Sequence, residues 1–263
     1  MSGVNFSDLK ARILSAIAMV AIGGVCLWLG EQAFVILVVS AVGLMGWELF
    51  KMMVHEAPYG RAEAHGLISA IMVATFTYTL GGWVTIIGLV SGAVLLASRM
   101  EKDKAIFALY LSLIMVGGHA LILLRDAGIT PVMWLILIVV ASDVAGYFVG
   151  RIIGGPKFWP RFSPKKTWSG TLAGWICAGG VGYGFVTQMG MDMLAVPVSV
   201  ALAFAGQLGD IAESAIKRRY GVKDASDLIP GHGGVMDRFD ALIAVASLAL
   251  ILAKLGLLAG LLG

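Results

Sequence analysis

Charged side chains are scarce in this chain. Only 13% of its 263 residues are charged, whereas 59% are apolar, and a soluble globular domain usually carries about 25% charged residues. So few charges could not cover a surface that faces water. The length alone would allow one or two soluble domains, but the composition excludes that class and predicts an integral membrane protein.

Several other signals are missing. There are only two cysteines, Cys26 and Cys177, and neither has a neighbouring cysteine or histidine, so we expect buried thiols without a disulfide or a metal. The chain has no GxxxxGK[ST] motif, so any nucleotide must be held in another way. No small-residue cleavage site follows the polar N-terminus, which favours a retained first helix over a signal peptide. The absence of an internal repeat argues against an inverted-repeat transporter.

Long apolar runs dominate what is present. A helix needs about 20 apolar residues to cross a bilayer, and the sequence offers nine candidates: 13–29, 33–50, 66–80, 82–98, 105–124, 130–150, 169–188, 193–216 and 239–262. The third and fourth are short and could form a tight helical hairpin. We therefore predict an all-α membrane protein with about nine spans.

The positions of the cations support this topology. With the N-terminus in the cytoplasm, 17 of the 19 lysines and arginines fall in inner segments, and only Arg125 falls outside. Lys254 lies within the last run. Positive residues favour cytoplasmic loops, so we predict a cytoplasmic N-terminus and an external C-terminus. Removing a pair of spans, such as the third and fourth, would preserve this alternation.

Polar residues are unevenly distributed along the chain. Residues 1–129 contain short loops and plain apolar helices, which predicts a transmembrane scaffold of about five helices. Residues 130–263 contain two long basic loops and most of the embedded acids. We predict that this second region, with about four helices, carries the catalytic function.

Some ionisable residues lie inside the apolar runs, where they are costly and often functional. Glu48 stands at the cytoplasmic end of the second run, and we expect it to reach the lipid headgroups. His119 is expected to pack or to form a hydrogen bond. Asp143 lies deeper in the sixth run, before Gly146 and Gly150, whose spacing lets another helix approach closely. Asp143 is therefore a candidate for supporting a functional site.

The eighth run carries the densest polar face. Asp210, Glu213, Ser214 and Lys217 are three, four and seven residues apart, so they share one side of a helix. A salt bridge between Glu213 and Lys217 would explain that pair without a function, but not Asp210. Two acids one turn apart suit a divalent cation, which prefers carboxylate oxygens.

Two inner loops have the composition of phosphate sites. In 214–241, cations accompany glycines that let backbone N–H groups approach an anion, and Asp237 and Asp240 follow at the start of the last run. In 150–174, Lys165, Lys166 and Thr167 precede Ser169 at a helix N-terminus, where anions bind readily. Headgroup contact is the alternative for the second loop.

The stretch from 214 to 240 resembles the signature of the phosphatidate cytidylyltransferase (CDP-diacylglycerol synthase) family. The matching positions are Ser214, Lys217, Arg218, Lys223, Asp224, Ser226, Pro230, His232, Gly233, Gly234, Asp237, Arg238 and Asp240. The segments SPKKTWSG, from Ser163, and QLGD, from Gln207 to Asp210, are also similar to that family. The resemblance covers roughly 140–241, and the first 130 residues match only in hydropathy.

The resemblance implies a membrane-embedded, dimeric enzyme that uses Mg²⁺ to convert phosphatidate and CTP to CDP-diacylglycerol and pyrophosphate. It also implies phospholipid biosynthesis in a bacterial inner membrane. The residues fit this reaction independently, because a lipid phosphate can attack CTP without an activated nucleophile, and phosphoryl-type transfer depends mainly on positioning and charge neutralisation.

These observations together give a hypothesis for the site. We expect a metal, with room for a second cation, at Asp210 and Asp237, supported by Glu213 and Asp240. The catalytic set is Asp210, Asp237, Lys217, Arg218, Lys223 and His232, with His232 on a phosphate or on the leaving pyrophosphate. The substrate-binding set is Lys165, Lys166, Thr167, Ser169, Ser214, Gly233, Gly234 and Arg238. The supporting set is Asp143, Gln207 and Asp224, of which Asp143 would close the polar cavity.

Other functions compete with this reading. Embedded acids also occur in transporters and channels, although the charges here gather toward one membrane face rather than at the middle. A related CTP-using membrane enzyme, such as a polyprenol kinase or another lipid cytidylyltransferase, would need the same kinds of group. A scaffold protein would not need so many phosphate- and metal-type side chains.

Overall fold

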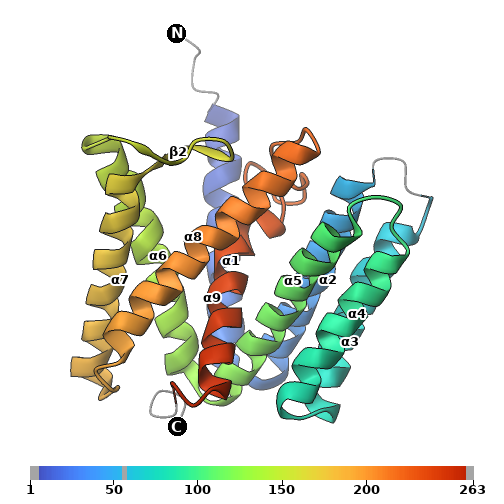
Figure 1. Ribbon diagram of the computed structural model, residues 1–263, viewed down its shortest axis with the longest axis horizontal. Coiled ribbons are helices and arrows are strands. Elements are labelled where there is room, and N and C mark those ends of the chain that lie inside the picture. The colour runs from blue at the N-terminus through green and yellow to red at the C-terminus, as the bar shows by residue number, and fades with distance from the viewer. Residues whose placement is uncertain (1–5, 55–57, 259–263) are drawn as a thin grey trace. The chain divides into compact units, whose positions relative to one another are not determined.

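The computed structural model describes residues 6–54 and 58–258, with side chains described from residue 10 onward. Most of this part of the chain is helical (Figure 1). Helices suit a membrane because they satisfy their own backbone hydrogen bonds where no water is present. The described residues form two compact units, Met1–Ile122 with Tyr220–Phe239, and Leu123–Arg219 with Asp240–Gly263.

The first unit contains α1 (Phe6–Leu29), α2 (Glu31–Met53), α3 (Arg61–Thr79), α4 (Gly82–Ser98) and most of α5 (Lys104–Asp126). In its core the ring of Phe50 stacks on His65 at a centroid distance of 4.0 Å, and Phe107 meets both rings edge-on. His119 is buried and its Nδ1 lies 3.0 Å from Thr77 Oγ1, which confirms the hydrogen bond expected for it.

The second unit contains α6 (Ile129–Ile152), a hairpin, α7 (Trp168–Met189), α8 (Ala195–Arg219) and most of α9 (Met236–Lys254). The close approach predicted at Gly146 and Gly150 is confirmed, because both face Gly170 of α7. A side chain at Gly170 would lie 3.2 Å from Gly150 Cα and closer still to the Gly146 carbonyl oxygen. Where α6 and α7 diverge, apolar side chains line a groove of about 900 Å³.

The hairpin was not predicted. Strand β1 (Lys157–Trp159) pairs with β2 (Ser163–Thr167) in antiparallel register, with Lys157 opposite Thr167. Strand β2 leads directly into α7 (Figure 1). The Thr167 side chain caps that helix by accepting a hydrogen bond from the Gly170 N–H at 3.2 Å. A basic segment that was expected to be a loop therefore forms a hairpin that is tied to a helix N-terminus by a capping hydrogen bond.

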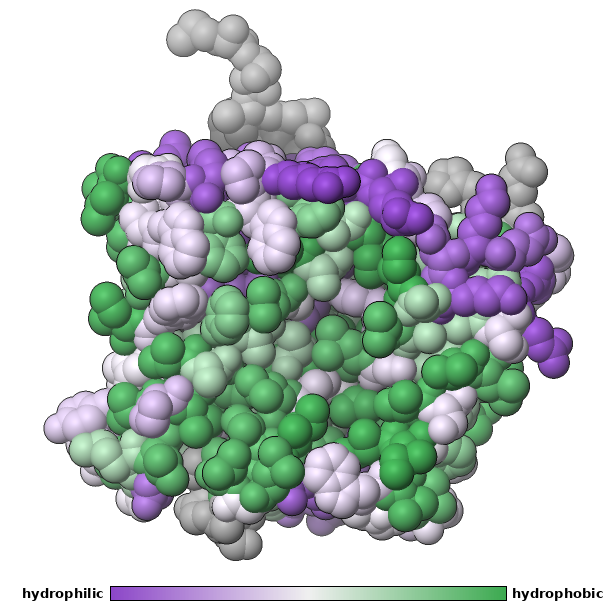
Figure 2. Space-filling view, in the orientation of Figure 1, coloured by the Kyte–Doolittle hydropathy of each residue, from purple (hydrophilic) through white to green (hydrophobic). Residues whose placement is uncertain are grey.

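The nine predicted apolar runs correspond to α1 to α9 among the residues that the structure describes. Five of these helices are long and apolar enough to cross a membrane, namely Lys10–Leu29, Glu31–Met53, Lys104–Asp126, Ile129–Ile152 and Ala195–Arg219. On the face drawn in Figure 2, apolar side chains cover the middle of the helices and hydrophilic ones gather toward helix ends. The chain is a helical membrane protein, and a count of nine spans with fixed termini stays a prediction.

Two expectations about single residues were wrong. Cys177 is exposed on α7 rather than buried, although both cysteines are free as predicted. The physical reason is that an apolar neighbourhood in a membrane helix also suits a surface that faces lipid. Lys254 lies in the last turn of α9 rather than inside a longer run, because that helix ends there.

Candidate active site

Three carboxylates come together in the second unit. Asp210 and Glu213 lie one turn apart on α8, and Asp240 lies near the start of α9. Each offers an oxygen, and these oxygens all lie within 4.8 Å of one another. The two helices can approach because α8 carries Gly206 and Gly209 against α9, where a side chain at Gly209 would lie 2.7 Å from the Asp240 carbonyl oxygen.

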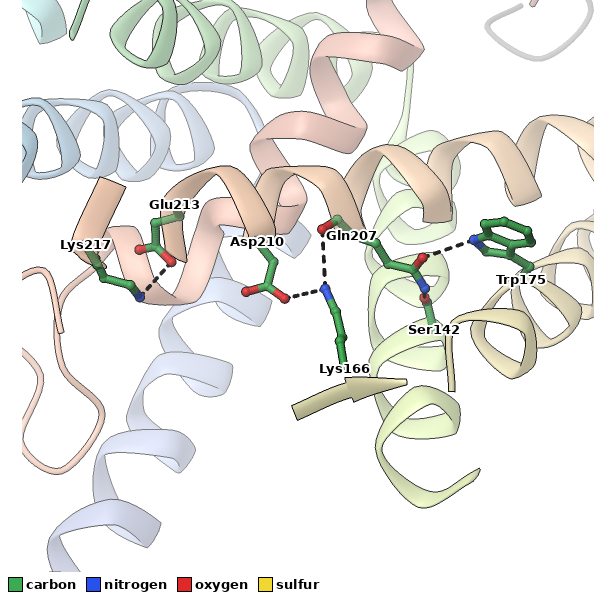
Figure 3. Close-up of polar contacts among 7 residues, drawn as sticks. All are labelled: Ser142, Lys166, Trp175, Gln207, Asp210, Glu213 and Lys217. Atoms are coloured by element: carbon green, nitrogen blue, oxygen red, sulfur yellow. Dashed lines mark hydrogen bonds and ion pairs between the residues drawn. The ribbon is translucent and has the colours of Figure 1, made fainter. Parts of the chain in front are cut away.

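Two lysines offset the charge of this cluster (Figure 3). Lys217 Nζ donates to Glu213 Oε2 at 2.9 Å, which confirms the salt bridge considered for that pair. Lys166, from β2, forms an ion pair with Asp210 and also donates to the Gln207 carbonyl oxygen at 3.3 Å. Asp210 is thus part of a mixed cluster of carboxylates and ammonium groups rather than an isolated acid.

A polar layer continues along α8 beside Asp210. The buried Gln207 side chain accepts from Trp175 Nε1 at 3.1 Å and donates to Ser142 Oγ at 3.3 Å (Figure 3). Asp143, the neighbour of Ser142 on α6, interacts electrostatically with Lys166 and Asp210. Asp143 therefore belongs to the same polar region, and its supporting role stays a prediction. Sequence reasoning missed Ser142 and Trp175, because no motif contains them.

The remaining residues predicted around the hairpin have specific places. Thr167 is buried as the cap of α7, and Ser169 Oγ donates to the Gly154 carbonyl oxygen at 2.5 Å. Lys165 is exposed on β2, beside the partly buried Lys166. On α8, Ser214 is partly buried and Arg218 is exposed. Lys166 is the hairpin lysine that the structure brings to the carboxylate cluster.

The loop 220–235 and the first turn of α9 belong to the first unit. Asp237 Oδ2 accepts from the backbone N–H groups of Gly234 at 2.7 Å and Ala225 at 2.8 Å. Gly233 has a φ of +83°, which favours glycine, and Asp224 packs against it. Asp237 thus closes the loop on itself, and its predicted metal role stays a prediction.

Helix α1 also contacts this loop. Ser15 Oγ lies 2.7 Å from His232 Nδ1 and donates toward the Pro230 carbonyl oxygen at 3.0 Å. His232 is therefore oriented from outside the signature segment. Lys223 and Arg238 are exposed. Ser15 was not predicted, since it lies 217 residues from His232 along the chain.

The expectation for Glu48 was wrong. Its side chain does not reach the headgroups, because the residue is 0% exposed. The carboxylate instead accepts hydrogen bonds from Ser226 Oγ and from the backbone N–H groups of Val235 and Met236. A buried acid at a helix end was read as an interfacial side chain because its partners are 178 to 188 residues away.

The donor set of the second unit suits a hard divalent cation. Carboxylate oxygens are the ligands that Mg²⁺ prefers, and it is commonly held by one or two carboxylates plus substrate phosphates. Lysine is a flexible point charge that can contact a carboxylate or a phosphate oxygen. The fold and the site together define a helical membrane protein. Its polar centre contains carboxylates that could hold a metal ion and lysines that could contact phosphate.

Comparison with known proteins identifies the family. The model of the cytidylyltransferase family matches residues 10–255. A phosphatidate cytidylyltransferase of Brucella suis is 34% identical over 92% of this chain and 92% of its own length. The enzymes of the same name from Staphylococcus epidermidis and Bacillus subtilis are 32% and 31% identical, over 93% and 90% of this chain and 98% and 95% of their own lengths. The chain belongs to the cytidylyltransferase family and is an enzyme of that type.

Proposed function

We propose that this enzyme transfers the cytidylyl group of CTP to phosphatidate, giving CDP-diacylglycerol and pyrophosphate for phospholipid synthesis. The observation that carries the proposal is the cluster of Asp210, Glu213 and Asp240 with Lys166 and Lys217. The cluster combines carboxylates suited to a divalent cation with lysines suited to phosphate groups. It lies in a membrane protein whose relatives are named for this activity.

The reaction needs little covalent help from the protein. A phosphate oxygen of phosphatidate attacks the α-phosphorus of CTP, and the bond from that phosphorus to the β-phosphate bridging oxygen breaks. Pyrophosphate leaves with the electron pair, and no protein nucleophile is consumed. The work of the site is to align the two phosphates and to neutralise their charge, which is the usual basis of phosphoryl-type catalysis.

Each part of the cluster has a role in this scheme. Asp210, Glu213 and Asp240 would hold Mg²⁺. Asp237 is a further metal ligand predicted from the signature. The bound ion would supply electrostatic neutralisation of the CTP phosphates and the leaving pyrophosphate. Lys166 and Lys217 exchange carboxylate contacts for phosphate contacts. Arg218, Lys223, His232 and Arg238 contact further phosphate oxygens.

The membrane setting completes the proposal. The chain spans the bacterial inner membrane nine times, with its N-terminus in the cytoplasm and its C-terminus outside, and it acts as a homodimer. The active site faces the cytoplasm, where CTP is dissolved and the phosphate of a membrane lipid is within reach. The one-sided distribution of lysine and arginine supports this orientation.

A labelling assay tests the proposed function. Protein purified in detergent is incubated with phosphatidate, Mg²⁺ and CTP labelled either on the α- or on the γ-phosphate. We expect the α-label in the lipid product, the γ-label in pyrophosphate, and no product with excess EDTA. The γ-label in the lipid would instead indicate a kinase. Ion flux in proteoliposomes without CTP, with no labelled lipid, would favour a transporter.

A further inference from the structure

The carboxylate of Glu48 is buried near the C-terminal end of α2, and all its recorded donors come from the signature segment. Ser226 Oγ donates to Oε1 at 2.5 Å, and the N–H groups of Val235 and Met236 donate at 2.9 and 2.7 Å. These two amides open α9, where the first N–H groups have no partner within the helix. A carboxylate there is favoured by the helix dipole and by charge-assisted hydrogen bonds.

Gly234 shows that the fit is tight. A Cβ atom built on Gly234 would lie 2.9 Å from Glu48 Cδ, 3.0 Å from Oε2 and closer still to Oε1, and these are its three nearest neighbours. Unlike Gly233, Gly234 does not have the positive φ that favours glycine. The side chain of Glu48 is therefore the obstacle to a larger residue at position 234, and the backbone conformation is not.

The same glycine also touches Asp237. The Gly234 N–H donates to Asp237 Oδ2 at 2.7 Å, while its Cα faces the Glu48 carboxylate. A displacement of Glu48 would consequently shift Gly234, and with it the hydrogen bond that orients Asp237. Glu48 lies outside the signature segment, on α2, although the family model also covers that helix.

We propose that Glu48 is a positioning residue for cytidylyl transfer, which fixes residues 226–236 and the orientation of Asp237. This inference rests on the proposed function. The second glycine of the His-Gly-Gly segment then serves to admit the Glu48 carboxylate rather than to approach a substrate phosphate. Glu48 acts through the loop and does not touch the reacting atoms.

A first experiment compares Glu48→Gln with Glu63→Gln. Glutamine has the shape of glutamate, but its amide NH₂ cannot accept, so at least one of the three donors loses its acceptor. We expect kcat to fall about tenfold, the size of one lost hydrogen bond to a charged group. Amide exchange at Val235 and Met236 should become faster, and the KM for CTP should change less than kcat. Glu63, which is exposed on α3, should tolerate the change.

A double-mutant cycle tests the contact itself. Gly234→Ala alone should lower kcat about tenfold or more, because Glu48 must move away, whereas in a Glu48→Ala background it should add less than about twofold. Gly180→Ala on α7 is the matched glycine control, because nothing lies within 4 Å of its Cβ position. If Glu48→Ala does not fold, Ser226→Ala removes a single hydrogen bond from the same carboxylate and should speed exchange at residues 226–236.

The outcomes separate the two proposals. Additive effects in the cycle, or unchanged amide exchange in Glu48→Gln, would overturn the positioning role whatever the activity. A lower unfolding temperature with unchanged kcat and exchange in the folded protein would overturn it as well. If the parent protein is inactive but Glu48→Gln still shows faster amide exchange, the proposed function is wrong. Glu48 would then be a residue that only stabilises the loop.

Discussion

The carboxylates of the two units are held in different ways. In the second unit, Asp210 and Glu213 pair with the side chains of Lys166 and Lys217. In the first unit, Glu48 and Asp237 accept hydrogen bonds from backbone N–H groups.

The difference has a chemical consequence. A lysine side chain is flexible and can leave one oxygen for another at modest cost, so the ion pairs of the second unit suit the proposed exchange for a cation and for substrate phosphates. A backbone N–H cannot leave its position without moving the chain. We therefore expect the first unit to fix the geometry of the signature loop and the second to provide exchangeable charge. Four substitutions test this division.

The largest effect is expected for Asp210→Asn. The change removes one charge from the carboxylate cluster and keeps the size of the side chain, so the cluster should lose its affinity for a divalent cation. We expect kcat for CDP-diacylglycerol formation to fall at least about a hundredfold, as for other groups that stabilise developing charge. The unfolding temperature in detergent should stay close to that of the parent. Asp126→Asn, at an exposed helix end, is the control, and near-normal turnover in Asp210→Asn would remove its metal role.

Asp237→Asn tests whether a carboxylate held by backbone groups also serves the metal. Asparagine keeps one acceptor oxygen, so the loop should hold its shape, with only somewhat faster exchange at Ala225 and Gly234. Turnover should still fall, at least about tenfold, and a higher Mg²⁺ concentration should be needed, because the negative charge is gone. A titration of activity against Mg²⁺ measures this. Faster exchange with unchanged turnover would limit Asp237 to a structural role.

Sequence reasoning predicted what depends on local periodicity. The apolar run predicted at 105–124 corresponds to α5 (Lys104–Asp126), because the length of an apolar run is enough to indicate a membrane helix. The shared face of Asp210, Glu213 and Lys217 follows from helical spacing. The ion pair between Glu213 and Lys217, which that spacing allowed, is present in the structure.

Long-range partners could not be predicted in this way. Asp240 joins Asp210 because Gly206 and Gly209 set the contact of α8 with α9, and the spacing of one helix does not reveal its register against another. The partners of Glu48 lie 178 to 188 residues away. The hairpin before α7 was missed because its strands are three and five residues long, too short for an alternating pattern.

Lys166→Ala should have an intermediate effect. It removes the cation paired with Asp210, so a substrate phosphate loses one contact. We expect the KM for CTP or for phosphatidate to rise about tenfold, in line with one charged hydrogen bond. The neighbouring Lys165, exposed on β2, provides a matched control in which a smaller change is expected. Equal and negligible effects of Lys166→Ala and Lys165→Ala would contradict a substrate role and would favour general contact of this segment with lipid headgroups.

Ser15→Ala should have the smallest effect. It tests whether the first unit only fixes geometry. The change removes the hydroxyl that lies 2.7 Å from His232 Nδ1 and contacts the Pro230 carbonyl oxygen, and leaves every charge in place. A neutral hydrogen bond contributes about 0.5–1.5 kcal/mol, so kcat should fall about two- to tenfold. Ser98→Ala, whose hydroxyl bonds only within its own turn among the recorded contacts, should be silent. If Ser15→Ala instead cost as much as Asp210→Asn, the first unit would contribute directly to the chemistry, and its role could no longer be limited to fixing geometry.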